Sequence, residues 1–220
     1  MKALIFDLDG TLVDTVYGHA LSWQRALAEA GIEADAARLH RRIGMASELL
    51  VDESAREAGR KISDAKAKAA HERHAELFAR LVPKPRPLAG AVELLRKLRQ
   101  RRVPHGIATS GQRDSIRPAI DALKLPASAI VVDGTSAKQA KPDPDLFIQC
   151  RRRLGAADKD CFVIGDASWD ILAARRAGML AVGLLSGGYG EDELYRAGAF
   201  RVYRDPRELL ASIRQLGLSL

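Results

Sequence analysis

Short apolar runs alternate with longer amphipathic stretches along most of this chain. The apolar runs predict strands at residues 3–7, 105–109, 130–132, 162–166, 181–184 and 200–203. Apolar residues recur at helical spacing between these runs, which predicts helices at residues 89–101, 113–123, 144–154, 169–177 and 206–216. Gly155 and Gly178 follow two of these helices, as glycine commonly does after a last turn. The alternation predicts an α/β fold with a doubly wound parallel sheet, covered by helices on both faces.

Residues 15–86 do not follow this alternation. Their apolar positions are spaced as in helices, at residues 16–30, 36–42, 47–58 and 63–82. The proline-rich segment at residues 83–87 then gives a stiff return. We therefore expect two parts: an α/β core built from residues 1–14 and 87–220, and a small all-helical domain at residues 15–86.

Length and composition narrow the class of protein. A chain of 220 residues can bury one core and a smaller appendage, and 47% hydrophobic residues with 5% aromatic ones indicate neither disorder nor a membrane protein. The apolar start is cut off by Asp7, too early for a signal peptide. We expect a cytoplasmic protein that does not bind membranes, with Cys150 and Cys161 as buried free thiols.

The net charge of +7 raises the question of nucleic-acid binding. The basic clusters, at residues 96–102 and 151–153, fall at the ends of predicted helices, where cations complement the helix dipole. Aromatic residues are not interleaved with them, and no nucleic-acid-binding motif is present. We expect no nucleic-acid partner, and the excess charge instead helps to attract anionic substrates.

Two carboxylates mark the end of the first predicted strand. Asp7 follows the apolar run, Asp9 comes two residues later, and Gly10 and Thr11 open a turn. Because strand residues alternate in direction, Asp7 and Asp9 leave the strand on the same side. Two like charges this close are costly unless a cation or a shared proton offsets them. The pair therefore predicts a chemical site.

Further polar residues fall at the ends of other predicted strands, where open α/β sheets bind their ligands. They are Thr109, Ser110 and Gly111 after the second strand, and Asp166 and Asp170 after the fourth. Taken alone, Thr-Ser-Gly fits a simple turn with a helix cap, and Asp170 fits a carboxylate favoured by a helix dipole. Lys141 precedes Pro142 and is biased toward an extended conformation.

Four segments in order resemble the motifs of the haloacid dehalogenase superfamily of phosphohydrolases, in the phosphoglycolate phosphatase and β-phosphoglucomutase-like branch with a helical cap. They are Asp-Leu-Asp-Gly-Thr-Leu-Val-Asp at residues 7–14, Ile-Ala-Thr-Ser-Gly at 107–111, Lys141-Pro142, and Val-Ile-Gly-Asp-Ala-Ser-Trp-Asp at 163–170. The resemblance covers the whole chain and implies that residues 15–86 form the cap.

The resemblance also implies roles for single residues. Asp7 matches the nucleophile that forms an aspartyl-phosphate, Asp9 the general acid and base, and Lys141 the lysine between nucleophile and phosphate. The dehalogenases of the superfamily lack a carboxylate at the Asp9 position. Phosphoryl oxygens would be bound by Gly10, Thr11, Thr109, Ser110, Gly111 and Lys141. Mg²⁺ would be held by Asp7, the Asp9 main-chain carbonyl and Asp166, with Asp170 as a further ligand or bound to water or Lys141.

We thus expect a Mg²⁺-dependent phosphatase, a monomer or homodimer, that hydrolyses a small phosphorylated metabolite through an aspartyl-phosphate. A sugar phosphomutase and a non-catalytic phosphate-binding protein remain alternatives. A phosphonatase is disfavoured, since no cap lysine stands out as a Schiff base. In the cap, His19 and Trp23 lie near the hinge, and we expect His19 to make an ordinary core or hinge hydrogen bond. Gly44 predicts a turn that faces the site. Arg41 or Arg42 would touch the substrate or lie at a solvated helix end.

Overall fold

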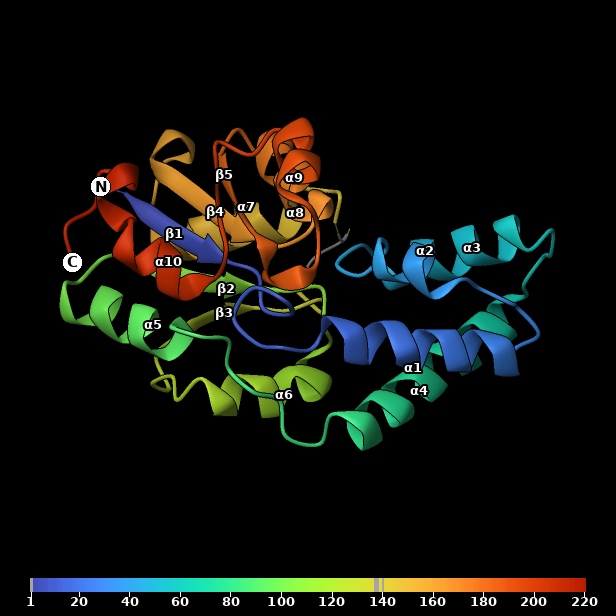
Figure 1. Ribbon diagram of the computed structural model, residues 1–220. Coiled ribbons are helices and arrows are strands. Elements are labelled where there is room, and N and C mark those ends of the chain that lie inside the picture. Colours follow the sequence, from blue (N-terminus) through green and yellow to red (C-terminus); the bar gives the residue numbers. More distant parts are fainter. Residues whose placement is uncertain (1, 137–138, 140) are drawn as a thin grey trace.

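A computed structural model describes residues 2–136, 139 and 141–220 of the chain (Figure 1). In this part of the chain a single sheet holds six parallel strands in the order β3-β2-β1-β4-β5-β6. The strands are β1 (Ala3–Phe6), β2 (His105–Ala108), β3 (Ile130–Val132), β4 (Cys161–Gly165), β5 (Leu180–Leu184) and β6 (Arg201–Tyr203). Successive strands run outward from β1 to β3, and the chain then returns to β4 on the other side of β1.

The alternation of side chains along β1 divides the core into two layers. Leu4 and Phe6 pack with α5 (Ala91–Gln100), α6 (Arg113–Ala122) and α10 (Pro206–Ala211) on one face. Ala3 and Ile5 pack with α7 (Asp145–Leu154), α8 (Ser168–Arg176) and α9 (Glu191–Ala197) on the other face. Figure 1 shows these two helical layers below and above the sheet. Both faces of the sheet are therefore buried, which accounts for its almost wholly apolar strands.

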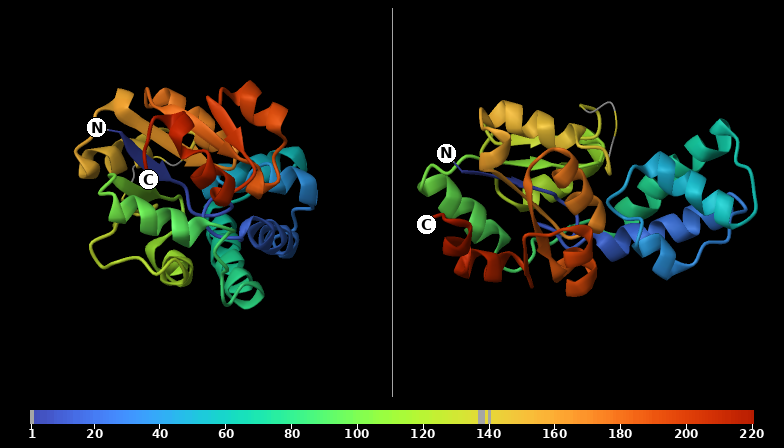
Figure 2. Two further views of the ribbon diagram at one scale, coloured as in Figure 1. Left: turned by 60° about the vertical axis from the view of Figure 1, so that its left-hand side comes forward. Right: turned by 90° about the horizontal axis from the view of Figure 1, so that it is seen from above.

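Four further helices lie beyond the carboxyl ends of the strands. They are α1 (Val16–Glu29), α2 (Ala36–His40), α3 (Ser47–Glu57) and α4 (Asp64–Leu81). They form a separate group in Figure 1 and in the right view of Figure 2. Helices α1 and α4 pack along one another. A hydrophobic cluster that includes Trp23, Leu27 and Leu50 holds the group together, and Trp169 of α8 packs against this cluster from the core.

The chain enters and leaves this helical group at one place. Val13 forms an isolated bridge with Pro87, and the Asp14 N–H donates to the Arg86 carbonyl at 2.9 Å. These contacts agree with boundaries near residues 14 and 87. We retain as a proposal the division into a core of residues 1–14 and 87–220 and a helical cap of residues 15–86, and use "cap" below for this segment.

The predicted fold class, an α/β fold with a doubly wound parallel sheet and helical additions, is confirmed. All six predicted strands are present, and their ends differ by at most one residue. Two predictions on helices were wrong. Helix α9 was not expected, and the last helix ends at Ala211 and is followed by a separate 3₁₀ turn, Ile213–Leu216. Among the residues of α9 only Leu194 is buried, so this short helix carries no apolar stripe that its sequence could display.

Two smaller predictions on burial and charge also agree with the structure. Cys150 and Cys161 are buried free thiols, and burial raises the pKa of Cys150 to about 12. The basic clusters occupy the last turns of α5 and α7. Within the described ranges, no helix combines the length and the apolar character needed to cross a membrane.

Candidate active site

Asp7 and Asp166 follow two neighbouring strands at the place where the strand order reverses. Asp7 comes directly after β1, Asp166 directly after β4, and the Asp7 N–H donates to the Ile164 carbonyl of β4 at 2.8 Å. The gap between such strands is where open α/β sheets bind ligands, because the following loops turn to opposite faces. Both carboxylates are 3% exposed, so each is held inside the protein at the edge of the sheet.

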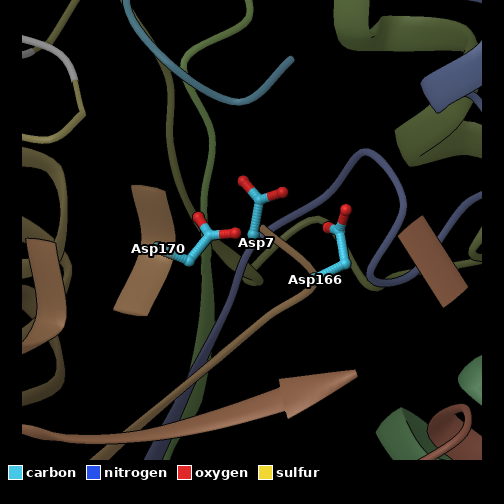
Figure 3. A group of neighbouring side chains, drawn as sticks. All are labelled: Asp7, Asp166 and Asp170. Atoms are coloured by element: carbon cyan, nitrogen blue, oxygen red, sulfur yellow. The ribbon is translucent and has the colours of Figure 1, made fainter. Parts of the chain in front are cut away.

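Asp170, one turn into α8, joins these two carboxylates. One oxygen atom from each of Asp7, Asp166 and Asp170 lies within 4.8 Å of the others, and Figure 3 shows Asp7 between the other two. The fully buried Lys141 donates to Asp7 Oδ1, and its Nζ lies 2.8 Å from Asp170 Oδ1. Asp166 instead accepts a hydrogen bond of 2.8 Å from the Thr11 hydroxyl. The cluster thus holds three carboxylates, two of which contact one ammonium group.

Burial sets the electrostatics of this cluster. It raises the pKa of Asp7 to about 7, despite the opposing effect of Lys141, and the neighbouring Asp170 and Asp9 carboxylates add to the increase. Burial also raises the pKa of Asp166 well above its ordinary value, with Asp170 and Asp7 contributing. Burial alone would lower the pKa of Lys141, but Asp170 and Asp7 raise it above its ordinary value. Ionisation of both Asp7 and Asp166 is therefore costly unless a further cation offsets their charge.

The donor set and its surroundings fit a hard cation such as Mg²⁺. Carboxylate oxygens are the ligands that Mg²⁺ prefers, and one or two carboxylates usually suffice because the ion keeps several waters. Gly10 and Gly187 lie against Asp166, and a Cβ on either glycine would collide with its carboxylate. The close approach of these two backbones therefore leaves no room for a side chain at positions 10 and 187. The Asp170–Lys141 contact matches the alternative in which Asp170 binds the lysine.

Asp9 is outside this triad and contacts residues at the hinge of the cap. Its Oδ1 accepts a hydrogen bond of 2.6 Å from the Thr15 hydroxyl and lies 3.4 Å from His19 Nε2. Burial favours a higher pKa for Asp9, but His19, together with the hydrogen bond from Thr15, holds the pKa below its ordinary value. His19, expected to make an ordinary core or hinge hydrogen bond, therefore contacts the second carboxylate of the first motif.

The loop after β2 supplies polar groups next to Asp7. Thr109 is 1% exposed, and its Oγ1 accepts a hydrogen bond of 3.1 Å from the Gly111 N–H. The buried Ser110 hydroxyl has no hydrogen-bond partner among the described residues. An unsatisfied buried hydroxyl is costly, so its position beside the Asp7 cavity indicates an oxygen-rich ligand that completes it.

A cavity of about 650 Å³ lies between the core and the cap, and both parts supply its walls. Asp7, Asp9 and Lys141 line its core end, as do three other residues with predicted binding roles, Thr109, Ser110 and Gly111. Gly10 and Thr11 are not among its described lining residues, because Thr11 faces Asp166 and the Gly10 carbonyl accepts from Ser186 at 2.6 Å. The structure therefore gives Thr11 a supporting contact with Asp166.

The cap contributes an aromatic wall that the sequence did not reveal. Trp23 and His74 stack with ring centroids 4.1 Å apart, and His19 stacks on Phe78 at 3.8 Å. His19 Nδ1 also lies 3.1 Å from His74 Nε2. Trp23 and His19 were identified only as residues near the hinge, and His74 was not singled out. The helical spacing of His71, His74 and Phe78 on α4 was the available signal, since it places them on one face.

The two cap arginines lie in different environments. Arg42 lines the cavity, but its Nη2 lies 2.5 Å from Glu57 and its Nη1 donates to Ser54. Arg41 faces the core outside this cavity, where it donates to the Gly188 carbonyl and pairs with Glu193 at 3.1 Å. Gly44, which has a φ of 94°, lies in a turn that faces Ala167 and Trp169, on the side of the core site.

Direct hydrogen bonds join the α2–α3 loop of the cap to the core. The Ala46 N–H donates to the Lys141 carbonyl at 2.8 Å. The Arg41 carbonyl accepts from both Trp169 Nε1, at 2.8 Å, and the Tyr189 hydroxyl, at 2.7 Å. The structure therefore shows the cap in contact with the core, directly above the cavity.

Comparisons with known proteins agree with this architecture. The sequence model of the haloacid dehalogenase-like hydrolases matches residues 1–178. The chain is 33% identical to validoxylamine A 7'-phosphate phosphatase of Streptomyces hygroscopicus subsp. limoneus, over 83% of this chain and 85% of the relative. It is 31% identical to β-phosphoglucomutase of Bacillus subtilis, over 95% of this chain and 92% of that enzyme.

A solved structure covers almost the same length. The crystal structure of a hydrolase from Pseudomonas syringae superposes with a TM-score of 0.94 at 44% identity, over 98% of this chain and 99% of that one. The core motifs, the sheet order and these similarities lead to one conclusion: the chain belongs to the haloacid dehalogenase-like hydrolase family.

Proposed function

We propose that this protein is a Mg²⁺-dependent phosphatase that hydrolyses a small phosphorylated metabolite through an aspartyl-phosphate on Asp7. One observation carries the proposal. The Asp7 carboxylate is buried at the end of a ligand cavity and is bound by the equally buried Lys141. A carboxylate fixed in this way can attack a phosphoryl group, while the ammonium offsets the charge that develops on the phosphoryl oxygens.

The proposed reaction has two steps, transfer of the phosphoryl group to Asp7 and hydrolysis of the aspartyl-phosphate. An Asp7 oxygen attacks phosphorus, the bond from phosphorus to the leaving oxygen breaks, and Asp9 donates a proton to that oxygen. Asp9 then accepts a proton from a water that attacks the aspartyl-phosphate, which releases inorganic phosphate and restores the Asp7 carboxylate. Thr15 and His19 orient Asp9 for both transfers. Thr109, Ser110 and Gly111 bind the phosphoryl oxygens during attack.

Asp7, the Asp9 main-chain carbonyl and Asp166 would hold the Mg²⁺ ion, and Asp170 would orient Lys141. When bound, the ion supplies positive charge that offsets the phosphate and the carboxylates and favours the attack. Closure of the cap over the cavity would keep bulk water away during the first transfer.

Phosphate release from p-nitrophenyl phosphate in the presence of Mg²⁺ tests the proposal. We expect turnover by the wild-type protein and a loss of several orders of magnitude in Asp7→Asn, which keeps the shape but removes the nucleophile. Glu53→Gln, on the exposed surface of α3, serves as the matched control. Equal turnover in Asp7→Asn and wild type would contradict the assignment of Asp7.

A sugar phosphomutase is the second candidate, because a β-phosphoglucomutase is 31% identical over 95% of this chain. Such an enzyme uses the same aspartyl-phosphate but returns the phosphoryl group to a sugar. Conversion of β-glucose 1-phosphate to glucose 6-phosphate without release of inorganic phosphate would favour the mutase. Release of phosphate without isomerisation would favour the phosphatase.

A further inference from the structure

The cap side of the cavity carries three carboxylates, all of them exposed to solvent. Glu48 and Asp52 of α3 and Asp64 of α4 line the same cavity as Asp7. Glu48 and Asp52 are four residues apart, which places them on one face of their helix. We call these three residues the acidic wall. The phosphoryl group of a substrate would sit at Asp7, so the acidic wall would face the remote group of the same molecule.

The cations that line the cavity do not neutralise the acidic wall. Arg42 lies 2.5 Å from Glu57, a residue outside the described lining of this cavity, and also donates to Ser54. Lys68 has a side chain that is 80% exposed, and its Nζ lies 3.9 Å from Glu72, which is also outside the lining. Arg42 and Lys68 thus have glutamate partners elsewhere, and Lys141 pairs with Asp7 and Asp170. An anionic remote group would meet uncompensated carboxylates on the cap side.

The third side of the cavity is aromatic and neutral. Trp23 stacks on His74, and the ring of His71 meets Trp23 edge-on at 5.2 Å. Burial lowers the pKa of His74 to about 2, so this ring carries no charge at neutral pH. Burial also lowers the pKa of His71, an effect that the nearby Glu48 and Asp52 oppose. Trp23 is only 4% exposed and has one face covered by His74, so it backs the two imidazoles. Neutral imidazoles exchange hydrogen bonds with hydroxyl groups, which favours a hydroxyl-rich substrate.

From this arrangement we infer that the substrate is a phosphate monoester of a hydroxyl-rich, sugar-sized alcohol whose remote end is uncharged or carries an amino group. Glu48 and Asp52 are the residues that determine this specificity. They disfavour phosphate monoesters with a remote carboxylate or second phosphate, because such groups would place like charges side by side. The inference rests on the proposed phosphatase function and names the substrate class of the same cavity.

Two matched pairs of substrates isolate the effect of charge. Glucitol 6-phosphate and 6-phosphogluconate are linear six-carbon esters that differ in a terminal hydroxymethyl or carboxylate group. Glucosamine 6-phosphate and glucose 6-phosphate are ring sugars that differ in an amino or hydroxyl group. For the wild-type protein we expect kcat/KM to favour the neutral member of the first pair by about tenfold or more, and the amino member of the second pair by a smaller factor.

Variants then assign the preference to the acidic wall. In the double variant Glu48→Gln/Asp52→Asn, both ratios should fall toward one. Glu53→Gln is the matched control, since Glu53 lies on the same helix, pairs with Arg56 and is not part of the described lining. This control should keep both wild-type ratios.

Several results would overturn the inference. Equal kcat/KM within each pair in the wild-type protein would do so, as would a preference for 6-phosphogluconate. Ratios that survive in Glu48→Gln/Asp52→Asn would show that other residues discriminate. A protein that hydrolyses neither p-nitrophenyl phosphate nor any sugar phosphate would contradict the proposed function. In that case the ratio of the two Kd values within each substrate pair, measured by titration calorimetry, would test the charge preference independently of catalysis.

Discussion

At the scale of single residues, the two carboxylates of the first motif have opposite surroundings. Asp7 lies against Lys141 and two other buried carboxylates, and burial raises its pKa to about 7. Asp9 lies against Thr15 and His19, which hold its pKa below its ordinary value despite burial. The lowered pKa of Asp9 suits a base for the second step, and a cation bound beside Asp7 would lower the Asp7 pKa and keep the nucleophile ionised. This contrast allows the two roles to be separated by experiment.

Asparagine substitutions should stop the reaction at different points. Asp7→Asn has no nucleophile, so no phosphoenzyme can form. Asp9→Asn keeps the nucleophile but lacks the base for the second step, so an aspartyl-phosphate should accumulate with p-nitrophenyl phosphate, whose leaving group needs little protonation. Intact-protein mass spectrometry after a rapid acid quench measures both species. A phosphoenzyme in Asp7→Asn would show that another residue is the nucleophile.

Removal of the metal should affect both activity and stability. We expect EDTA to abolish phosphate release and Mg²⁺ to restore it, whereas Ca²⁺ should support it poorly because its looser coordination misplaces Asp7. Mg²⁺ should also raise the Tm of the wild-type protein, since an ion that binds only the native state stabilises it. This shift should be much smaller in Asp166→Asn. Full activity in EDTA, or equal Tm shifts in the two proteins, would contradict the metal assignment.

At the scale of secondary structure, the α2–α3 loop fastens the cap to the core. Trp169 and Tyr189 both donate to the Arg41 carbonyl, and His40 Nε2 lies 2.7 Å from the Gly187 carbonyl. Gly187 in turn lies against Asp166. Trp169 directly precedes Asp170 in α8, and Gly187 is in the loop after β5. The position of the cap is therefore linked to the geometry of the acidic triad through these two segments.

Loss of these hydrogen bonds should favour an open cap. Trp169→Phe and Tyr189→Phe keep the aromatic rings and remove the donors, each at a net cost of about 0.5–1.5 kcal/mol. The double variant should therefore lower kcat/KM by roughly tenfold, mainly through KM, and speed proteolysis near the hinge. Tyr195→Phe, on the exposed surface of α9, is the matched control. Unchanged kinetics and proteolysis in the double variant would show that these contacts do not control closure.

The sequence predicted elements with a strong pattern better than those without one. Buried strands such as β1 and β4 read as continuous apolar runs, and their positions were right within one residue. Helix α9 buries only Leu194, so its residues carried no periodic signal. The same reasoning applies to the site. The sequence motifs contain four of the site residues: Asp7, Asp9, Lys141 and Asp166. The contact of His19 with His74 joins residues 55 positions apart, and helical spacing predicts contacts only within one helix.

At the scale of the whole molecule, buried cap histidines should make stability depend on pH. Burial lowers the folded-state pKa of His74 from about 6.5 to about 2. Below pH 6.5, His74 takes up a proton in the unfolded chain but not in the native state. The free energy of unfolding is therefore highest above pH 6.5 as far as His74 is concerned, and it falls as the pH decreases toward 2.

Between pH 6.5 and pH 5 this difference amounts to at most about 2 kcal/mol. Urea unfolding of wild type and His74→Phe at pH 7 and pH 5 measures it. The variant keeps an aromatic ring on Trp23, so its free energy of unfolding should fall less with acidity. Parallel pH profiles in the two proteins would show that His74 is protonated in the native state.

The division into core and cap leads to a prediction about folding. The two hydrophobic clusters on the faces of the sheet contain no residue from 15–86, and the buried residues of the third cluster all fall within 16–55. The Val13–Pro87 bridge already brings the two ends of the excised segment together. A variant in which Asp14 is joined directly to Pro87 should therefore fold as a domain with its own core.

This deletion should keep Asp7, Lys141 and Asp166 in place but remove the acidic wall and the aromatic side of the cavity. We expect a cooperative urea transition and a Mg²⁺-dependent rise in Tm, with slow turnover of p-nitrophenyl phosphate. The preference between glucitol 6-phosphate and 6-phosphogluconate should be lost, because the discriminating carboxylates are on the cap. Full-length protein is the control in each assay. A deletion variant that lacks a cooperative transition would show that cap and core fold as one unit, and one that keeps the preference would place the specificity in the core.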